Sequence, residues 1–231
     1  MSEMARLRPV SRPRLYQQVV QQIVAWVDDN GLGVGDRLPP ERELASRLGV
    51  SRATVSQALV AMEVVGVVAV RHGDGAVIVD SSGTSKVVDA LHRHAERTPD
   101  VIEARGALES ELAALAAVRR TEDDLARIDS AIEVMAADIE AGGRGLEGDE
   151  LFHAAVTEAG HSRVLQRLML EISDLVRETR IESLSQPDRP RESLEGHRLI
   201  AEAIRGADAA KAAAAMREHI VKVSDVALLR D

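Results

Sequence analysis

The sequence LPPERELASRLGVSRATVSQAL, residues 38–59, contains two short helical segments separated by a glycine-bearing turn. Gly49 ends the first segment, because glycine adopts the left-handed conformation that closes a helix. Ser51 begins the second segment as a side chain that caps a helix N-terminus well. We therefore expect helices at 41–48 and 52–64, joined by a tight turn.

The segments on either side complete a recognisable order of elements. Residues 15–29 carry apolar side chains at helical spacing. On the other side, the β-branched runs 67–71 and 76–79 flank the glycine-rich segment 72–75, which predicts a β-hairpin. A winged helix-turn-helix has this order of elements: two helices, a tight turn, a third helix and a hairpin. The hairpin is the wing.

The rest of the chain predicts a separate helical domain. The small polar residues 81–85 form the expected linker between a DNA-binding domain at 1–80 and a helical domain at 86–231. Pro99 suits the first turn of a helix, and glycines separate the later segments. The predicted fold is therefore mainly α, a winged helix-turn-helix followed by an antiparallel all-helical bundle. Its helices are expected at 86–96, 99–118, 122–141, 146–159, 162–184, 190–205 and 208–228.

Charge and composition narrow the class of protein. The formal net charge is −9, but residues 1–80 carry nine Lys+Arg and nine Asp+Glu, so the acidity lies entirely in the C-terminal part. A neutral domain still binds phosphates if its arginines share one face. The chain has no cysteine, which excludes disulfides and thiolate metal sites. No run approaches the roughly 18–20 apolar residues of a membrane helix, so we expect a cytoplasmic protein.

The start of the third helix carries the side chains expected to read DNA. A recognition helix enters the major groove with its N-terminal residues facing the bases. Arg52 suits guanine O6 and N7, and the hydroxyls of Ser51 and Thr54 suit phosphates or base edges. A helix cap and a surface charge are the alternative interpretation of Ser51 and Arg52. The full set of expected DNA contacts is Arg42, Ser51, Arg52, Thr54, His72 and Gly73.

Together with RHGDGAVIV, residues 71–79, the opening stretch resembles the DNA-binding domain of the GntR family of regulators. The resemblance covers about residues 12–79 and implies that the six residues above contact operator DNA. The chain departs from the family pattern at two positions. Ser56 stands where the family usually has a DNA-contacting arginine, and Pro40 stands where it often has serine.

Four side chains in the C-terminal half have the spacing of a metal site. Asp149 and His153 are four residues apart on an expected helix and share one face. His197 lies about nine residues before the turn at Gly206, and His219 about twelve after it, so an antiparallel pair brings them to one level. Three imidazoles and a carboxylate suit Zn²⁺ or another late first-row ion. A surface ion pair and two unrelated histidines are the alternative.

This half also resembles the FCD ligand-binding domain of the FadR-type GntR regulators, over about residues 86–225. The matching stretches are RGALESELAALAA at 105–117, DELFHAAV at 149–156, EGHRLIAEAI at 195–204 and AAMREHI at 214–220. The resemblance implies that Asp149, His153, His197 and His219 hold a divalent ion, Zn²⁺ first, with Ni²⁺ or Mn²⁺ as alternatives. It also implies that Arg105 binds the carboxylate of an organic-acid effector through its bidentate fork. A salt bridge from Arg105 to Glu109 is the alternative.

These observations predict a non-enzymatic, ligand-responsive regulator, a repressor by family default, acting as a homodimer on palindromic operator DNA. One alternative is a metal-free regulator that binds acyl-CoA. The other is a metal-dependent hydrolase fused to a DNA-binding domain, which needs a general base beside a metal-bound water. Glu150 and Glu195 are near the expected ligands in sequence, but both point away from the ligand face.

Overall fold

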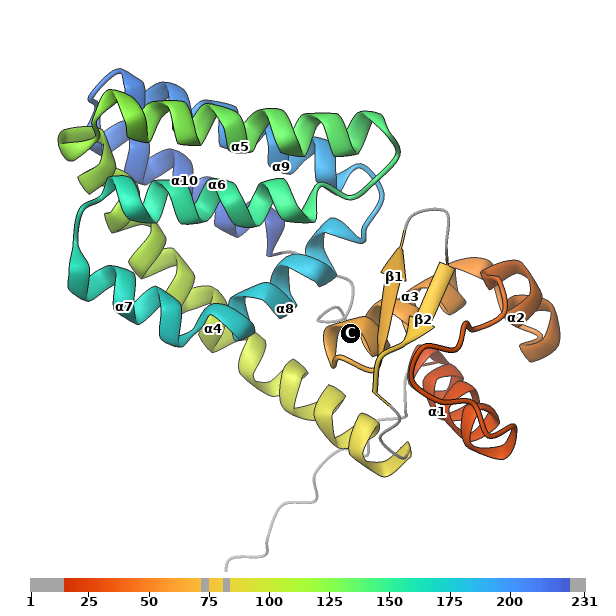
Figure 1. Ribbon diagram of the computed structural model, residues 1–231. Helices are drawn as coiled ribbons and strands as arrows, with labels where there is room; N and C mark the ends of the chain where they lie inside the picture. The colour runs from red at the N-terminus through yellow and green to blue at the C-terminus, as the bar shows by residue number, and fades with distance from the viewer. Residues whose placement is uncertain (1–14, 72–74, 81–83, 225–231) are drawn as a thin grey trace, which may run out of the picture.

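The computed structural model describes residues 15–71, 75–80 and 84–224, which form two helical domains (Figure 1). The N-terminal domain has the predicted winged helix-turn-helix order. Val68 pairs with Ile78, and Arg71 pairs with Gly75, in an antiparallel hairpin. Its elements are α1 (Leu15–Asp29), α2 (Glu41–Leu48), α3 (Arg52–Val64), β1 (Val68–Arg71) and β2 (Gly75–Ile78).

The three helices and the hairpin of this domain share one apolar core. Val20 and Ile23 of α1 pack in the same cluster as Leu59 of α3 and Ile78 of β2. Gly49 closes α2 at φ 65°, in the left-handed region that costs glycine little. The turn and the cap predicted from the sequence therefore position α3, whose N-cap Ser51 accepts a hydrogen bond from Thr54 N at 3.1 Å.

The C-terminal domain is an all-helical bundle, as predicted. The side chains of Ile128, Phe152, Ile200 and Met216 are fully or almost fully buried in one cluster with many alanines, so the helices pack closely. Helix α10 packs against α4 and α9, and α5 packs against α6. The elements are α4 (Thr84–Arg119), α5 (Glu122–Glu140), α6 (Leu146–Ala159), α7 (Arg163–Glu171), α8 (Ser173–Leu184), α9 (Arg189–Arg205) and α10 (Ala209–Val223).

Two of the expected helix boundaries are wrong. The predicted helices 86–96 and 99–118 are one helix, α4, with Pro99 inside it. A proline removes one backbone donor, and the packing of α4 against its neighbours outweighs that loss. The predicted helix 162–184 is instead two helices that meet at Ile172. Of the expected linker, Thr84 and Ser85 are helical, and 81–83 lie outside the described residues.

A buried ionic cluster joins α4 to α8. His94 lies on α4, with Nδ1 at 2.9 Å from Glu178 Oε2 and Nε2 at 3.0 Å from Glu182 Oε2. Burial alone lowers the pKa of His94, but the two carboxylates outweigh it and raise that pKa to about 9. The imidazole is therefore charged at neutral pH and ties the two helices together. Within the described residues, no helix is both long and apolar enough to cross a bilayer.

His94→Gln is expected to lower stability at neutral pH but not at high pH. Because the folded pKa of about 9 exceeds the usual 6.5, the charge of His94 stabilises the fold fully below about pH 6.5. That contribution, on the order of 3 kcal/mol, is lost as the pH rises through the folded pKa. Urea unfolding of both proteins at about pH 6 and about pH 10 measures it. A stability difference that does not depend on pH would contradict the assignment.

Candidate metal centre and nucleic-acid interface

The structure brings the four predicted ligands together inside the C-terminal bundle. Asp149 and His153 come from α6, His197 from α9 and His219 from α10. One ligand atom from each lies within 4.8 Å of all the others, and every one of the four residues is at most 5% exposed. The counting argument that placed His197 and His219 at one level agrees with this geometry, since their ring centroids are 4.7 Å apart.

The spacing of these atoms fits a small divalent ion. His197 Nε2 lies 3.3 Å from His153 Nε2 and 3.4 Å from Asp149 Oδ1. Two ligands bound tetrahedrally at about 2.0–2.1 Å from Zn²⁺ are separated by about 3.4 Å. Nitrogen and oxygen donors are also the set that late first-row divalent ions accept. The described residues therefore contain a buried group with the geometry and the chemistry to hold a metal.

Burial prepares two of the histidines to act as ligands. Removal from water lowers the pKa of His197 well below its usual value, and nearby His153 adds to that effect. Burial lowers the pKa of His219 in the same way, helped by His197. Both rings are consequently neutral near pH 7, and a neutral imidazole offers the lone pair that a metal needs.

Glu109 orients His153 from the side away from the ligand cluster. Its Oε2 lies against His153 Nδ1, so that Nε2 faces His197. Burial alone raises the pKa of Glu109, but Arg105 and His153 outweigh it, and the pKa lies well below its usual value. A carboxylate behind a metal-binding histidine fixes the tautomer of the ring. Sequence reasoning considered Glu109 only as a partner of Arg105.

Two packing contacts hold the other rings in place. Phe152 stacks on His197, with ring centroids 4.0 Å apart and an interplanar angle of 15°. Gly196 lies against His219, because a Cβ at position 196 would come within 2.6 Å of His219 Nδ1. The Gly-His pair in the sequence therefore provides one ligand and makes room for another.

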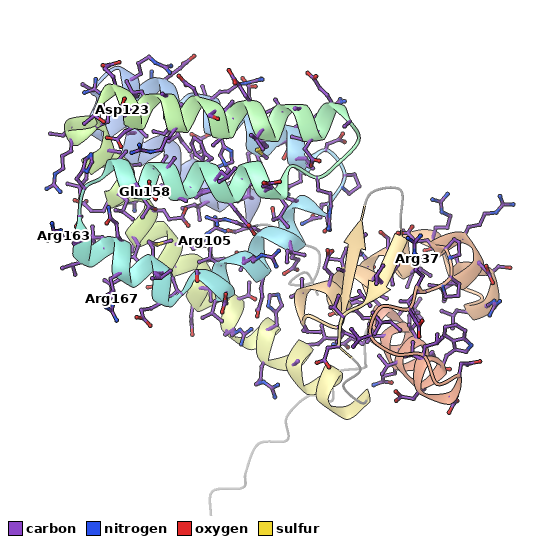
Figure 2. All side chains as sticks on the ribbon, in the orientation of Figure 1. Arg37, Arg105, Asp123, Glu158, Arg163 and Arg167 are labelled. Carbon is purple, nitrogen blue, oxygen red and sulfur yellow. The ribbon has the colours of Figure 1, made fainter. Side chains whose placement is uncertain are left out.

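Arg105 lies inside the bundle near the cluster (Figure 2) and is 2% exposed. Its Nε donates to Glu109 Oε1 at 2.8 Å, and its Nη1 donates to Thr179 Oγ1 at 3.1 Å. The salt bridge weighed as the alternative is therefore present. Binding of an effector by Arg105 stays a prediction.

A cavity of about 320 Å³ lies between α6, α7 and α8 and reaches the ligand cluster through His153. Its walls are mainly apolar, with Ala154, Leu170 and Val176 among them, and Arg180 provides a cation. Arg180 Nε lies 3.1 Å from Asp149 Oδ2. Arg105 is not among the side chains that line this cavity, so Arg180 is the arginine placed to meet a ligand there.

The N-terminal turn of α3 is open to solvent. Ser51 and Arg52 are exposed, Thr54 is half-buried, and Arg42 on α2 is exposed. Ser51 also caps the helix, so the structural role suggested for it is present beside the role proposed in DNA binding. His72 and Gly73, the expected contacts at the wing tip, lie outside the described residues.

Comparison with known proteins agrees with this two-domain organisation. Residues 15–78 match the family described as bacterial regulatory proteins, gntR family, and residues 100–222 match the FCD domain. The chain is 35% identical over 162 residues to the Uxu operon transcriptional regulator of Escherichia coli, covering 68% of this chain and 63% of that protein. It is 33% identical over 209 residues to the HTH-type transcriptional regulator LutR of Bacillus subtilis, covering 87% and 95%.

Among solved structures, a GntR protein of Streptococcus agalactiae matches with a TM-score of 0.48 and 28% identity, covering 90% of this chain and 98% of that one. The two family matches and the relatives together establish the kind of protein. The chain belongs to the GntR family of transcription regulators, in which a DNA-binding winged helix-turn-helix is joined to an effector-binding FCD domain.

Proposed function

We propose that this regulator is a homodimer that binds a palindromic operator and senses a small organic acid at a metal-containing pocket. The observation that carries the proposal is the convergence of Asp149, His153, His197 and His219 beside the 320 Å³ cavity. The ion is Zn²⁺, with Ni²⁺ and Mn²⁺ as the alternatives. When bound, it would offer a positive charge and, by expanding beyond four ligands, a coordination position to an oxygen atom of a ligand.

The side chains around the cavity define how the acid binds. Arg180 borders the cavity, and its guanidinium has donors beyond the one that meets Asp149. A carboxylate between Arg180 and the metal ligands places the remainder of the molecule against Ala154, Leu170 and Val176. Arg105 stays a predicted contact, because its bonds to Glu109 and Thr179 would have to open first.

Effector binding regulates DNA binding through the arrangement of the two domains. A ligand changes operator occupancy only if it binds the DNA-competent and DNA-incompetent arrangements with different affinity. Repression that the acid relieves is the proposed direction. Over the described residues, no observation favours the acyl-CoA regulator or the fused hydrolase.

Arg180→Ala is expected to abolish the thermal stabilisation caused by the effector. A screen of small carboxylates and sugar acids, with and without chelator, identifies ligands that raise the unfolding temperature. Stabilisation by such a ligand should depend on metal and disappear in the variant. Arg167→Ala on α7 is the matched control, since Arg167 is 78% exposed and pairs with Glu171 on the outer surface. A screen in which no acid gives chelator-sensitive stabilisation would reject the proposed sensor.

A further inference from the structure

One face of α3 is turned toward α8 of the same chain. The two helices pack together and enclose a cleft of about 360 Å³ between the domains. Positions spaced by three, four and seven residues lie on one face of a helix. The α3 wall of the cleft consists of residues with that spacing, Ala53, Ser56, Gln57 and Val60. The opposite wall, at the end of α8, includes Glu182, Ser185 and Gln186.

This cleft adjoins the residues expected to read DNA. Ala53 and Gln57 are exposed and follow Arg52 along the same helix. In a complex, a recognition helix lies within a major groove about 12 Å wide and 8.5 Å deep, with DNA on both of its sides. A cleft of about 360 Å³ does not admit a duplex. The arrangement in the structure therefore leaves no room for a duplex on the side of α3 that faces α8.

A polar clasp, formed by Arg144, Glu63 and Ser185, holds the two domains in this arrangement. Arg144 donates from Nη1 and Nη2 to the two carboxylate oxygens of Glu63, both at 2.8 Å. Arg144 Nη1 also donates to Ser185 Oγ at 2.6 Å. Glu63 is the penultimate residue of α3, and its Oε1 accepts from Val70 N of β1 at 3.1 Å. The clasp thus joins the recognition helix and the wing to the C-terminal domain.

The clasp lies close in sequence to the candidate metal centre. Arg144 is two residues before the start of α6, and Asp149 lies in the first turn of that helix. Ser185 directly follows α8, which also carries Arg180 of the cavity wall. Movement of α6 or α8 on ligand binding therefore reaches the clasp through less than two turns of helix.

We infer that the reading face of α3 has two competing partners, operator DNA and helix α8 of its own chain, and that the clasp favours α8. The inference rests on the proposed function, because it concerns how that function is regulated. In the closed arrangement the regulator does not occupy its operator. Opening of the clasp releases α3, and an acid that relieves repression acts by favouring the closed arrangement.

Arg144→Gln tests this inference, because the inference predicts a change in operator affinity opposite in direction to the one expected from charge alone. Removing a positive charge by itself weakens DNA binding or leaves it unchanged. Loss of the clasp should instead tighten operator binding about fivefold or more, the usual lower range of coupling between sites. The operator duplex for this measurement is obtained by selecting tightly bound sequences from random DNA. The selection is carried out with the full-length wild type and with the full-length variant. Arg198→Gln on α9 is the matched control, since Arg198 is half-exposed and pairs with Glu195 of the same helix.

A double-mutant cycle separates the clasp from other effects. In a Glu63→Gln background, where the charge pair of the clasp is already lost, Arg144→Gln should cause little further tightening. The same gain in both backgrounds would overturn the inference. So would unchanged or weaker binding by Arg144→Gln, provided that its unfolding temperature and metal content match those of the wild type. Failure of every full-length protein to bind any specific duplex would instead reject the proposed function itself.

A distance measurement gives a second readout that does not depend on DNA. Because the chain has no cysteine, a double variant with Arg47→Cys on α2 and Arg167→Cys on α7 takes spin labels at these two positions and nowhere else. With labelled chains diluted in an excess of unlabelled chain, so that distances within one chain dominate, the wild-type background should give one narrow distance distribution, and Arg144→Gln should broaden it toward longer distances. Identical narrow distributions in the two backgrounds would contradict a clasp that holds the domains closed.

Discussion

Arg52→Ala should weaken specific operator binding by about 1–3 kcal/mol, or roughly fivefold to 150-fold. Arg52 is the first residue of α3 and is exposed, so its guanidinium can form two hydrogen bonds with one guanine. Alanine removes both bonds and leaves the helix intact, because Ser51 still caps it. The measurement compares the operator duplex with a scrambled duplex at one salt concentration.

The control for this prediction removes the same charge from the neighbouring helix. Arg47 on α2 is 56% exposed and pairs with Glu43 in the same helix. Arg47→Ala should affect binding to both duplexes by a similar factor, since loss of a surface charge acts on DNA of any sequence alike. Undiminished preference of Arg52→Ala for the operator would reject α3 as the recognition helix.

The double variant His197→Ala/His219→Ala should lose its metal. Two of the four donors disappear, and Asp149 and His153 alone do not complete the four positions that Zn²⁺ takes. The metal content measured by elemental analysis after dialysis should fall from about one ion per chain to near none. The same analysis of the wild type identifies the metal. Chelator should lower the unfolding temperature of the wild type but not of the variant.

Removal of two buried rings also destabilises the bundle, so a second variant keeps the test decisive. Asp149→Asn preserves the shape of the side chain while removing its charge, and it should weaken metal binding without unfolding the chain. His161→Ala is the control, because His161 is 47% exposed and pairs with Asp124 away from the cluster. Stoichiometric zinc in the folded double variant would refute the four-ligand site.

The parts of this structure that could be predicted from sequence are those set by local signals. Gly49 and Ser51 determine the turn before α3 through their own backbone and capping preferences. The four ligands follow from helical spacing within α6 and from equal distances to the turn between α9 and α10. Pro99 shows the limit of such signals, because packing continues α4 through a residue that usually ends a helix.

The parts that could not be predicted depend on how distant helices cross. Glu109 meets His153 across 44 positions of sequence, and nothing in the spacing of either residue indicates the contact. Arg180 lies on a helix with several exposed charges, so its position beside the cavity depends on the rotation of α8. The contact of Arg144 with Glu63 requires the relative placement of two domains, which no local pattern encodes.

The two ends of α3 are surrounded differently, and this has an evolutionary consequence. Arg52 at the leading turn is open to solvent, whereas Val60 and Glu63 near the other end meet the C-terminal domain. Substitutions of Arg52, which does not line the cleft, can therefore change which promoters are controlled while the contact with the C-terminal domain stays the same. Substitutions toward the other end can change the threshold of that response while the set of promoters stays the same.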